Sequence, residues 1–212
     1  MNTKFDKIFF ILDKEIPKYN VPVIDLIKVQ TNDPFKILIA TILSARTKDS
    51  TTHNAAEKLF SKIKTFDDFN KFSQLQIEKL IYPVGFYKTK AKHLKLLPEA
   101  IKQFNNKIPQ TIDELIKLPG VGRKTANLVM SVAFNEDAIC VDTHVHRISN
   151  RIGFIKTITP FESEMQLRKI LPIKYWKKIN FYFVAQGQNI CLPRGPKCNI
   201  CPINKYCEKH IL

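Results

Sequence analysis

Four of the five cysteines stand close together near the end of the chain, in the stretch CLPRGPKCNICPINKYC. They follow the pattern C-x6-C-x2-C-x5-C and are Cys191, Cys198, Cys201 and Cys207. Disulfides are disfavoured in an intracellular chain, and a structural zinc site normally has two Cys-x-x-Cys pairs or includes histidine, whereas only one such pair occurs here. Four thiolates in one compact loop favour a [4Fe-4S] cluster at residues 191–207, with zinc as the alternative. Cys140, in an apolar run, is expected to be buried.

A second stretch, LPGVGRKTANLV, places two of the six glycines, Gly120 and Gly122, directly before Arg123 and Lys124. The preceding segment TIDELIKL predicts a short helix over 111–118, and the following segment RKTANLVMSVAF predicts a second helix. Together they predict a helix-hairpin-helix over about 111–134. Glycines allow the backbone N–H groups of a helix N-terminus to approach a phosphate closely, which positions a duplex without reading its sequence. An ordinary helix corner explains one such glycine, but it explains Gly-x-Gly followed by two cations poorly.

The charge balance favours a polyanionic partner. The chain has 34 Lys and Arg against 19 Asp and Glu, which gives a formal net charge of +15. Nucleic acid is the partner that this excess favours, although a basic protein from a lysine-rich organism has the same composition. The longest apolar runs are too short for a signal peptide or a membrane span. We therefore expect an intracellular protein without a membrane partner.

The positioning elements are predicted to be helices almost throughout, so the fold class is all-α. Capping residues precede helix-spaced apolar runs, and no convincing alternating stretch predicts a strand. The predicted N-caps are Asp33, Asp49, Ser73 and Thr111. Prolines fall mostly between these runs, which predicts a packed bundle of short helices with tight corners.

Taken together, these motifs resemble the endonuclease III family of DNA glycosylases and AP lyases, within the helix-hairpin-helix superfamily. The resemblance runs through LIATILSARTKD, PVGFYKTKA, LPGVGRKTANLV, VDTHVHRISNRIGF and the cysteine loop. It implies a two-lobed all-α fold. A six-helix barrel domain would span 26–135, an iron-sulfur cluster domain would comprise 1–25 and 136–212, and DNA would lie between the lobes with the damaged base flipped out.

The same resemblance implies the chemistry. Lys124 occupies the nucleophile position of the family, and its amine would attack C1′ of the damaged nucleotide, form a Schiff base and cut the strand by β-elimination. Asp142 occupies the position of the catalytic carboxylate, where it would stabilise the sugar as the base departs. Asp142 is also well placed to be only an N-cap. Superfamily members that use water instead usually carry Ser or Tyr at the position of Lys124, so a bifunctional glycosylase and lyase is expected. The resemblance to the family implies oxidised pyrimidines as its substrates.

Further residues are expected to contact DNA. Arg46 stands where glutamine is frequent in the family. The resemblance implies that its loop fills the gap left by the flipped nucleotide and touches the orphaned partner base, so Arg46 is expected to affect the preference for the opposite base. Lys88 aligns without a gap to Lys124 in a second, similar helix corner. It is therefore the alternative candidate for the nucleophile as well as an expected DNA contact. The full set of expected contacts is Arg46, Gly85, Lys88, Gly120, Val121, Gly122, Arg123, Thr125, His144, Arg194 and Lys197.

Two other functions fit parts of the sequence. A non-catalytic helix-hairpin-helix protein that binds bent or damaged DNA explains the basic and hairpin features, but not a lysine and an aspartate at both catalytic positions. A glycosylase with AP lyase activity on uracil or mismatches would share those positions. The expected partner is damaged double-stranded DNA, bound by a monomer in the cytoplasm at the nucleoid.

Overall fold

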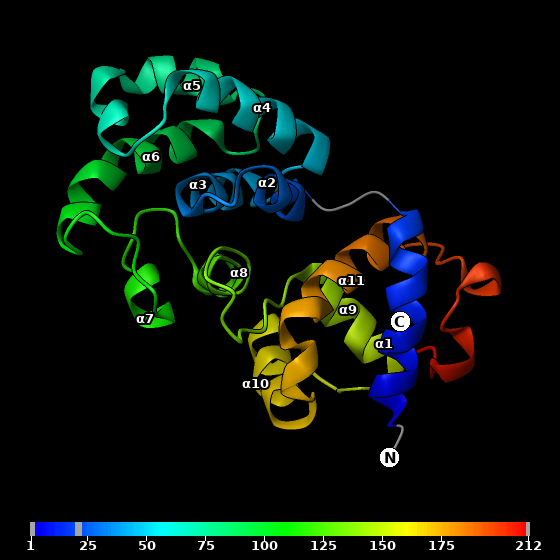
Figure 1. The fold of residues 1–212 in the computed structure, drawn as a ribbon. Helices are drawn as coiled ribbons and strands as arrows, with labels where there is room; N and C mark the ends of the chain where they lie inside the picture. The colour runs from blue at the N-terminus through cyan, green and yellow to red at the C-terminus, as the bar shows by residue number, and fades with distance from the viewer. Residues whose placement is uncertain (1–2, 20–22, 211–212) are drawn as a thin grey trace. The chain divides into compact units, whose positions relative to one another are not determined.

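A computed structural model describes residues 3–19 and 23–210, and every regular element within them is a helix (Figure 1). The all-α prediction is confirmed for these residues. The chain divides into two compact units. We call Val23–Glu136 the middle unit, and Met1–Pro22 together with Asp137–Leu212 the terminal unit. The predicted domain boundaries lie within three residues of these, while residues 1–2, 20–22 and 211–212 of the predicted cluster domain lie outside the described residues.

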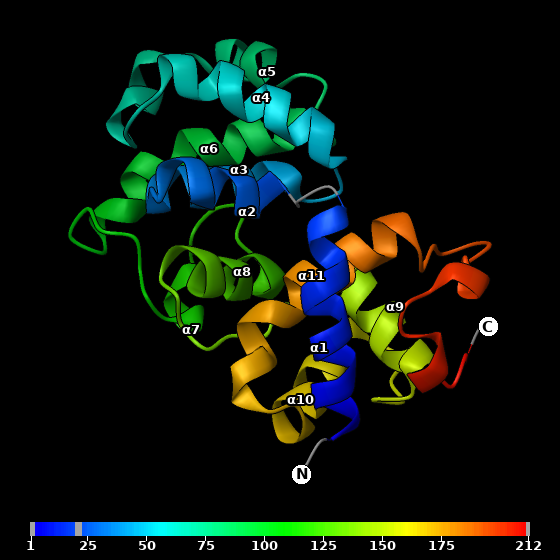
Figure 2. The same cartoon turned by 45° about the vertical axis from the view of Figure 1, so that its right-hand side comes forward.

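The middle unit is built around one mostly apolar helix, α3 (Pro34–Ser44). Its helices are α2 (Val23–Thr31), α3 (Pro34–Ser44), α4 (Asp49–Lys62), α5 (Gln74–Ile81), α6 (Tyr87–Lys102), α7 (Ile112–Leu115) and α8 (Arg123–Ala133), with a 3₁₀ helix at Asp67–Lys71. The sequence ILIATILSA gives α3 apolar side chains on all faces, and a helix of that kind must be buried. Accordingly α3 packs against α2, α4, α6 and α8 (Figures 1 and 2).

Local capping explains where several helices begin. The side chain of Asp33 accepts a hydrogen bond from the N–H of Phe35, and Ser73 forms a reciprocal capping box with Gln76. The prediction for Asp49 is wrong by one position. This residue is the first residue of α4, and Lys48 is the N-cap without a side-chain bond. The Asp49 carboxylate still favours the helix because it stands in the positively polarised first turn.

The terminal unit joins the first helix of the chain to the last third of the sequence. Its helices are α1 (Lys4–Glu15), α9 (Thr143–Ile152), α10 (Pro160–Ile170) and α11 (Trp176–Asn189), with 3₁₀ helices at Ile16–Lys18, Ile173–Tyr175, Cys198–Ile200 and Asn204–Tyr206. Phe9 of α1 stacks on Tyr175 at 4.1 Å between ring centroids, and Phe183 of α11 is fully buried in the same core. None of the described helices is long and apolar enough to cross a lipid bilayer.

Candidate active site and cysteine cluster

The hairpin turn before α8 depends on Gly120. Its φ of 80° lies in the left-handed region, where residues with a Cβ are strained. A Cβ there would also stand 3.0 Å from the Nδ1 atom of His93. The helix before the turn is shorter than predicted, because α7 ends at Leu115 and the chain then turns, with the N–H of Val121 donating to the carbonyl of Leu118 at 3.1 Å.

The N-terminus of α8 is open to a ligand. Gly122 is its N-cap and makes no side-chain capping bond, and nothing lies within 4 Å of the position that a Cβ of Gly122 would take. The first N–H groups of any helix lack intrahelical acceptors and attract anions. Arg123 is exposed and Lys124 is half-buried at this terminus. The side chain of Thr125 is buried, so this residue offers an anion only its backbone.

Val121 contributes to the turn through packing. Its side chain is 6% exposed, and its N–H group is used by the bond to Leu118. The structure therefore places Val121 as a support of the hairpin, although its sequence position had suggested contact with DNA.

Asp142 is the N-cap of α9. Its Oδ1 atom accepts hydrogen bonds from the N–H groups of His144 and Val145, both at 2.8 Å. The capping alternative is therefore observed. Both of these bonds use Oδ1, and together they fix the orientation of the carboxylate.

The two lysines of the similar helix corners differ in exposure. Lys88 and Lys124 are each the second residue of their helix, α6 and α8. Lys88 is exposed, whereas Lys124 is half-buried. The N-caps also differ, because Gly122 caps α8 and Phe86, with a φ of 56°, caps α6. The gap-free alignment therefore reflects a shared corner with different surroundings for the two amines.

Two loops of the middle unit meet beside this second corner. We call residues 45–48 the Arg46 loop and residues 82–86 the Gly85 turn. The N–H of Gly85 donates to the hydroxyl of Thr47 at 3.2 Å. The guanidinium carbon of Arg46 lies 5.5 Å from the ring centroid of Phe86. Both side chains are exposed, so the two loops present a cation and an aromatic ring together.

Sequence reasoning missed Lys90, which lies behind these loops. Lys90 is 6% exposed, and its ammonium donates to the carbonyls of Leu43 and Ala45 at 2.7 and 2.6 Å and to the hydroxyl of Thr47 at 3.1 Å. Burial lowers its pKa to about 8. The three acceptors and the negative end of α3 favour the ammonium form, so Lys90 is charged at neutral pH. A signal was present, because Lys90 shares the buried face of α6 with Leu94 and Leu97.

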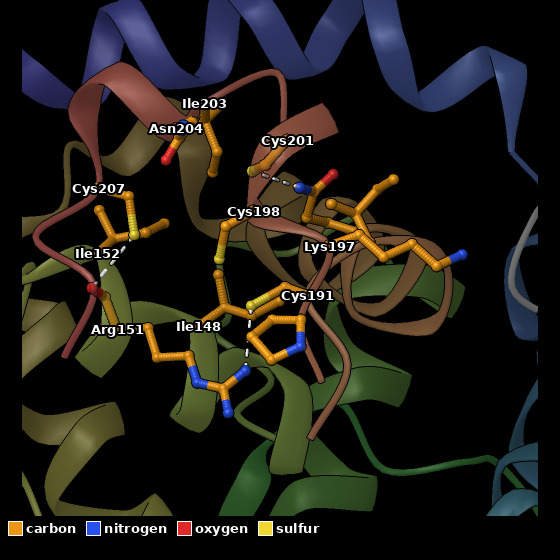
Figure 3. A pocket seen from close by; sticks show the side chains of 13 residues that line it. Ile148, Arg151, Ile152, Cys191, Lys197, Cys198, Cys201, Ile203, Asn204 and Cys207 are labelled. Atoms are coloured by element: carbon orange, nitrogen blue, oxygen red, sulfur yellow. Dashed lines mark hydrogen bonds between the residues drawn. The ribbon is translucent and has the colours of Figure 1, made fainter. Parts of the chain in front are cut away.

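The four predicted cysteine ligands line one cavity in the terminal unit (Figure 3). Ile148, Ile152, Ile190 and Ile203 complete an apolar wall. All five cysteines are free thiols, and Cys140 is buried elsewhere, as expected. Burial raises the pKa of the Cys201 and Cys207 thiols because a thiolate would lose its hydration there.

Two arginines of α9, which sequence reasoning also missed, hold the cysteine loop. Arg151 is 7% exposed and donates to the Sγ atom of Cys191 at 3.4 Å and to the carbonyls of Leu192 and Pro193 at 2.7 and 2.8 Å. Arg147 donates to the carbonyl of Cys191 at 2.8 Å. Guanidinium groups suit this task because they offer several donors in a fixed plane.

The remaining predicted contacts lie on the surface of the terminal unit or inside it. Arg194 and Lys197 are exposed on the loop between the first two cysteines. His144 is half-buried, with its ring 3.1 Å from the guanidinium of Arg147 and packed over Gly187 of α11. His144 therefore has a structural setting, whereas the two loop cations face solvent.

Comparison with known proteins agrees with this arrangement. The profile of the HhH-GPD superfamily of base excision DNA repair proteins matches residues 39–173. The endonuclease III of Thermotoga maritima is 44% identical over 177 residues, which cover 83% of each chain. The structure of a trapped endonuclease III–DNA covalent intermediate, an estranged-adenine complex, is 35% identical with a TM-score of 0.83 and covers 99% of this chain and 97% of that one. A thermostable thymine-DNA glycosylase is 27% identical with a TM-score of 0.82 and covers 98% and 97%.

The fold and the matched profile define a helix-hairpin-helix glycosylase of base excision DNA repair. Within that class the chain belongs to the endonuclease III family, and it is a DNA glycosylase and AP lyase.

Proposed function

We propose that this enzyme removes oxidised pyrimidines from duplex DNA and uses Lys124 as its nucleophile. The observation that carries the proposal is the position of Lys124, half-buried on the first turn of α8, beside an N-terminus with no side-chain cap. Likeness to a trapped covalent intermediate of an endonuclease III with DNA supports a covalent mechanism.

The proposed reaction needs only the DNA, proton transfers and one water molecule. The amine nitrogen of Lys124 loses a proton and bonds to C1′ of the damaged nucleotide, and the N-glycosidic bond breaks so that the base leaves with the electron pair and takes up a proton. The C1′–O4′ bond then breaks and O4′ takes up a proton, which opens the sugar ring to a Schiff base between C1′ and the lysine nitrogen. Loss of a proton from C2′ expels the 3′ phosphate oxygen and cuts the strand. Water then hydrolyses the Schiff base and frees the amine of Lys124.

Asp142 would assist this reaction through its carboxylate. Its Oδ1 atom is held by two backbone N–H groups, so the orientation of the group is set before substrate arrives. The Oδ2 atom would stabilise positive charge on the sugar as the base departs and would accept or return protons.

Duplex DNA would be bound mainly through its phosphates. The formal net charge of +15 supplies a favourable field, and the open N-terminus of α8 with Arg123 offers a phosphate site. The exposed Arg46, Lys88, Arg194 and Lys197 would add contacts. A base inside a duplex hides C1′, so the damaged nucleotide would be flipped out. We include in the proposal that one monomer acts alone, at the nucleoid in the cytoplasm.

The cysteine cavity would hold a [4Fe-4S] cluster through Cys191, Cys198, Cys201 and Cys207. All four thiols line this one cavity, together with apolar side chains. Four cysteines without a histidine in one compact loop support the cluster, and zinc stays the alternative.

The groups around these sulfurs also suit such a cluster. Arg151 and Gln186 each donate an N–H to a cysteine sulfur at 3.4 Å, and hydrogen bonds of this kind tune iron-sulfur clusters. When bound, the cluster would make the loop of Arg194 and Lys197 rigid for contact with phosphates.

A different base specificity is the second candidate. The similarity to a thymine-DNA glycosylase shows that this fold also serves an enzyme with another substrate, so removal of uracil or mismatched thymine stays the alternative. A protein that binds DNA without catalysis would share the hairpin and the charge but would form no covalent bond.

Trapping with borohydride tests the proposal. Purified protein is incubated with duplex DNA that carries either thymine glycol or an abasic site, and borohydride reduces the Schiff base to a stable amine. We expect a covalent protein–DNA band from both substrates for the wild type and for Lys88→Gln, and at least a hundredfold weaker band for Lys124→Gln.

The other outcomes separate the alternatives. A band from the abasic site only would indicate a lyase with another base specificity. A band that persists in Lys124→Gln and disappears in Lys88→Gln would make Lys88 the nucleophile. Tight binding without any band would favour either catalysis by water without a Schiff base or the non-catalytic function.

A further inference from the structure

The Arg46 loop and the Gly85 turn are held in strained backbone conformations. Arg46 has a φ of 54° and Phe86 a φ of 56°, in the left-handed region that side-chain-bearing residues avoid. Strain of this kind persists only where the surroundings enforce it, and it is common at functional sites. The cation–π contact between the two exposed side chains is weak because water surrounds both of them. Something behind the loops must therefore hold them.

Close backbone contact explains part of that support. A Cβ on Gly85 would lie 2.5 Å from the carbonyl oxygen of Arg46, so the two loops touch at a point where only glycine fits. The single hydrogen bond from Gly85 to Thr47 fixes their register. Neither this backbone contact nor the hydrogen bond involves a charged group, and Gly85 is the one residue of the Gly85 turn that takes part in both.

Lys90 supplies the stronger link because it reaches both loops. Its ammonium has three donors and meets three acceptors, the carbonyls of Leu43 and Ala45 and the hydroxyl of Thr47. Its backbone N–H makes the ordinary helical bond of α6 to the carbonyl of Phe86 at 3.0 Å, so the lysine stands on the first turn of the helix that follows the Gly85 turn. The buried side chain thus ties this helix to the end of α3 and to the Arg46 loop. The hydroxyl of Thr47 is shared, since it accepts from both Gly85 and Lys90.

We propose that Lys90 is a positioning residue that clamps the Arg46 loop to the Gly85 turn and so presents the Arg46 guanidinium and the Phe86 ring to DNA as one rigid pair. This inference rests on the proposed function, in which Arg46 contacts DNA, and on the expected contact at Gly85. Lys90 does not touch the substrate. It acts on opposite-base preference only through Arg46.

Amide hydrogen exchange tests the clamp without DNA. In Lys90→Met the side chain keeps its length and loses its donors, and we expect the amides of Thr47 and Gly85 to exchange at least tenfold faster than in the wild type. Thr47→Val is a milder variant that removes the shared hydroxyl and keeps the lysine. Unchanged exchange at both amides in Lys90→Met would overturn the proposal, whatever Thr47→Val does, because Thr47→Val also removes the acceptor of the Gly85 N–H.

Lys95 provides a matched control on the same helix. Its ammonium also donates to three oxygens, the carbonyls of Phe69, Asn70 and Phe72, at 2.9, 3.2 and 2.7 Å. Lys95→Met therefore removes an equivalent set of bonds that does not involve the Arg46 loop. We expect this variant to leave exchange at Thr47 and Gly85 within twofold of the wild type, whereas equal acceleration by both variants would mean general loosening and would contradict a specific clamp.

Binding measurements test the consequence for DNA. The dissociation constant is measured for duplexes with a tetrahydrofuran abasic analogue opposite each of the four bases. We expect Lys90→Met to reduce the spread of these constants at least threefold, and Lys95→Met to preserve it. The double variant Arg46→Gln/Lys90→Met should match Arg46→Gln alone, because Lys90 acts through Arg46.

Amide exchange and duplex binding test separate parts of the proposal, the clamp itself and its effect on DNA recognition. Additive effects in the double variant, or an unchanged spread in Lys90→Met, would overturn the link to DNA recognition. If the wild type bound none of the duplexes, the proposed function would be overturned together with that link, and amide exchange would still decide whether Lys90 is a clamp.

Discussion

Lys90 has a charged amine in a place where most proteins bury a hydrocarbon side chain. Its neighbours on the same face of α6 are Leu94 and Leu97, both fully buried. Taking an ammonium out of water costs several kcal/mol, which hydrogen bonds to carbonyls offset only in part. The depressed pKa of about 8 expresses that cost. A leucine or methionine would cost less at this position, so the lysine is explained better by what it holds in place than by stability.

This cost predicts a pH dependence of stability. Below pH 8 both the folded and the unfolded chain hold the Lys90 proton, and between pH 8 and the ordinary pKa of 10.5 only the unfolded chain does. The unfolded state then binds more protons, so stability rises with pH in that window. At one pKa unit per 1.36 kcal/mol, the rise is on the order of 3 kcal/mol. Urea unfolding from pH 7 to 11 measures it as the difference between the wild type and Lys90→Met.

The difference between the two proteins is the informative quantity, because other lysines and tyrosines titrate in the same range and cancel in it. A difference that stays flat from pH 7 to 11 would show that Lys90 keeps an ordinary pKa. A difference that falls as pH rises would mean that the three acceptors outweigh burial and raise the pKa.

Single residues also show where prediction from sequence ends. The N-cap role of Asp142 was foreseen as an alternative because capping depends on residues next to it in the chain, and the structure shows it. The contacts of Lys90 with Leu43, Ala45 and Thr47 join residues more than 40 positions apart. No local rule states which of several lysines in YKTKAKHLK meets the end of α3.

For whole helices, too, features set by neighbouring residues are predicted correctly and features set by distant packing are not. Asp33, Ser73 and Thr111 begin helices as predicted, since each cap is made within three residues along the chain. The predicted helix 111–118 is too long. Only Ile112–Leu115 is α-helical, because the chain turns early to place Gly120 in the left-handed region next to His93. That placement depends on α6, which carries His93, and thus on packing rather than propensity.

The hairpin between α7 and α8 allows a prediction that separates stability from binding. Gly120→Ala forces a Cβ into the left-handed region and towards His93, so we expect a loss of about 2 kcal/mol in the free energy of unfolding. Gly122→Ala has open space and an ordinary φ of −95°, so we expect a loss below about 1 kcal/mol. Urea unfolding measures both values.

Gly122→Ala should weaken DNA binding clearly, although its effect on stability is small. Its added methyl group stands at the N-terminus of α8, where a phosphate would approach the backbone. We expect Gly122→Ala to raise the dissociation constant for an abasic-analogue duplex about tenfold, which is 1.4 kcal/mol. Unchanged binding by this variant would argue against a phosphate at α8, whatever its effect on stability.

The molecule has two units, one formed by a continuous segment of the chain and the other by two separate segments. The middle unit is one continuous segment, whereas the terminal unit joins α1 to α9–α11. Local patterns in the sequence predict the helices of both units. They do not indicate that the first helix packs with the last third of the chain, an expectation that came from family resemblance. Phe9, Tyr175 and Phe183 carry that long-range packing, and apolar residues of this kind have no sequence mark of their partner.

Charge is the property of the whole molecule that bears most directly on DNA. Each phosphate contact made by a cation releases counterions and steepens the salt dependence of binding by about 0.9 in a log–log plot. Arg194 and Lys197 are exposed on the cysteine loop. We expect Arg194→Ala/Lys197→Ala to make the slope of log affinity against log salt shallower by about 1 to 2, measured on an abasic-analogue duplex between about 50 and 200 mM salt.

A control must separate local contact from total charge. Lys58→Ala/Lys62→Ala removes two exposed cations from α4 and lowers the formal net charge by the same amount, from +15 to +13. Direct contact by the cysteine loop requires the slope to change in the first variant and to stay near the wild-type value in the second. Equal changes in both would mean that the field of the whole protein attracts DNA and that the loop makes no phosphate contact of its own.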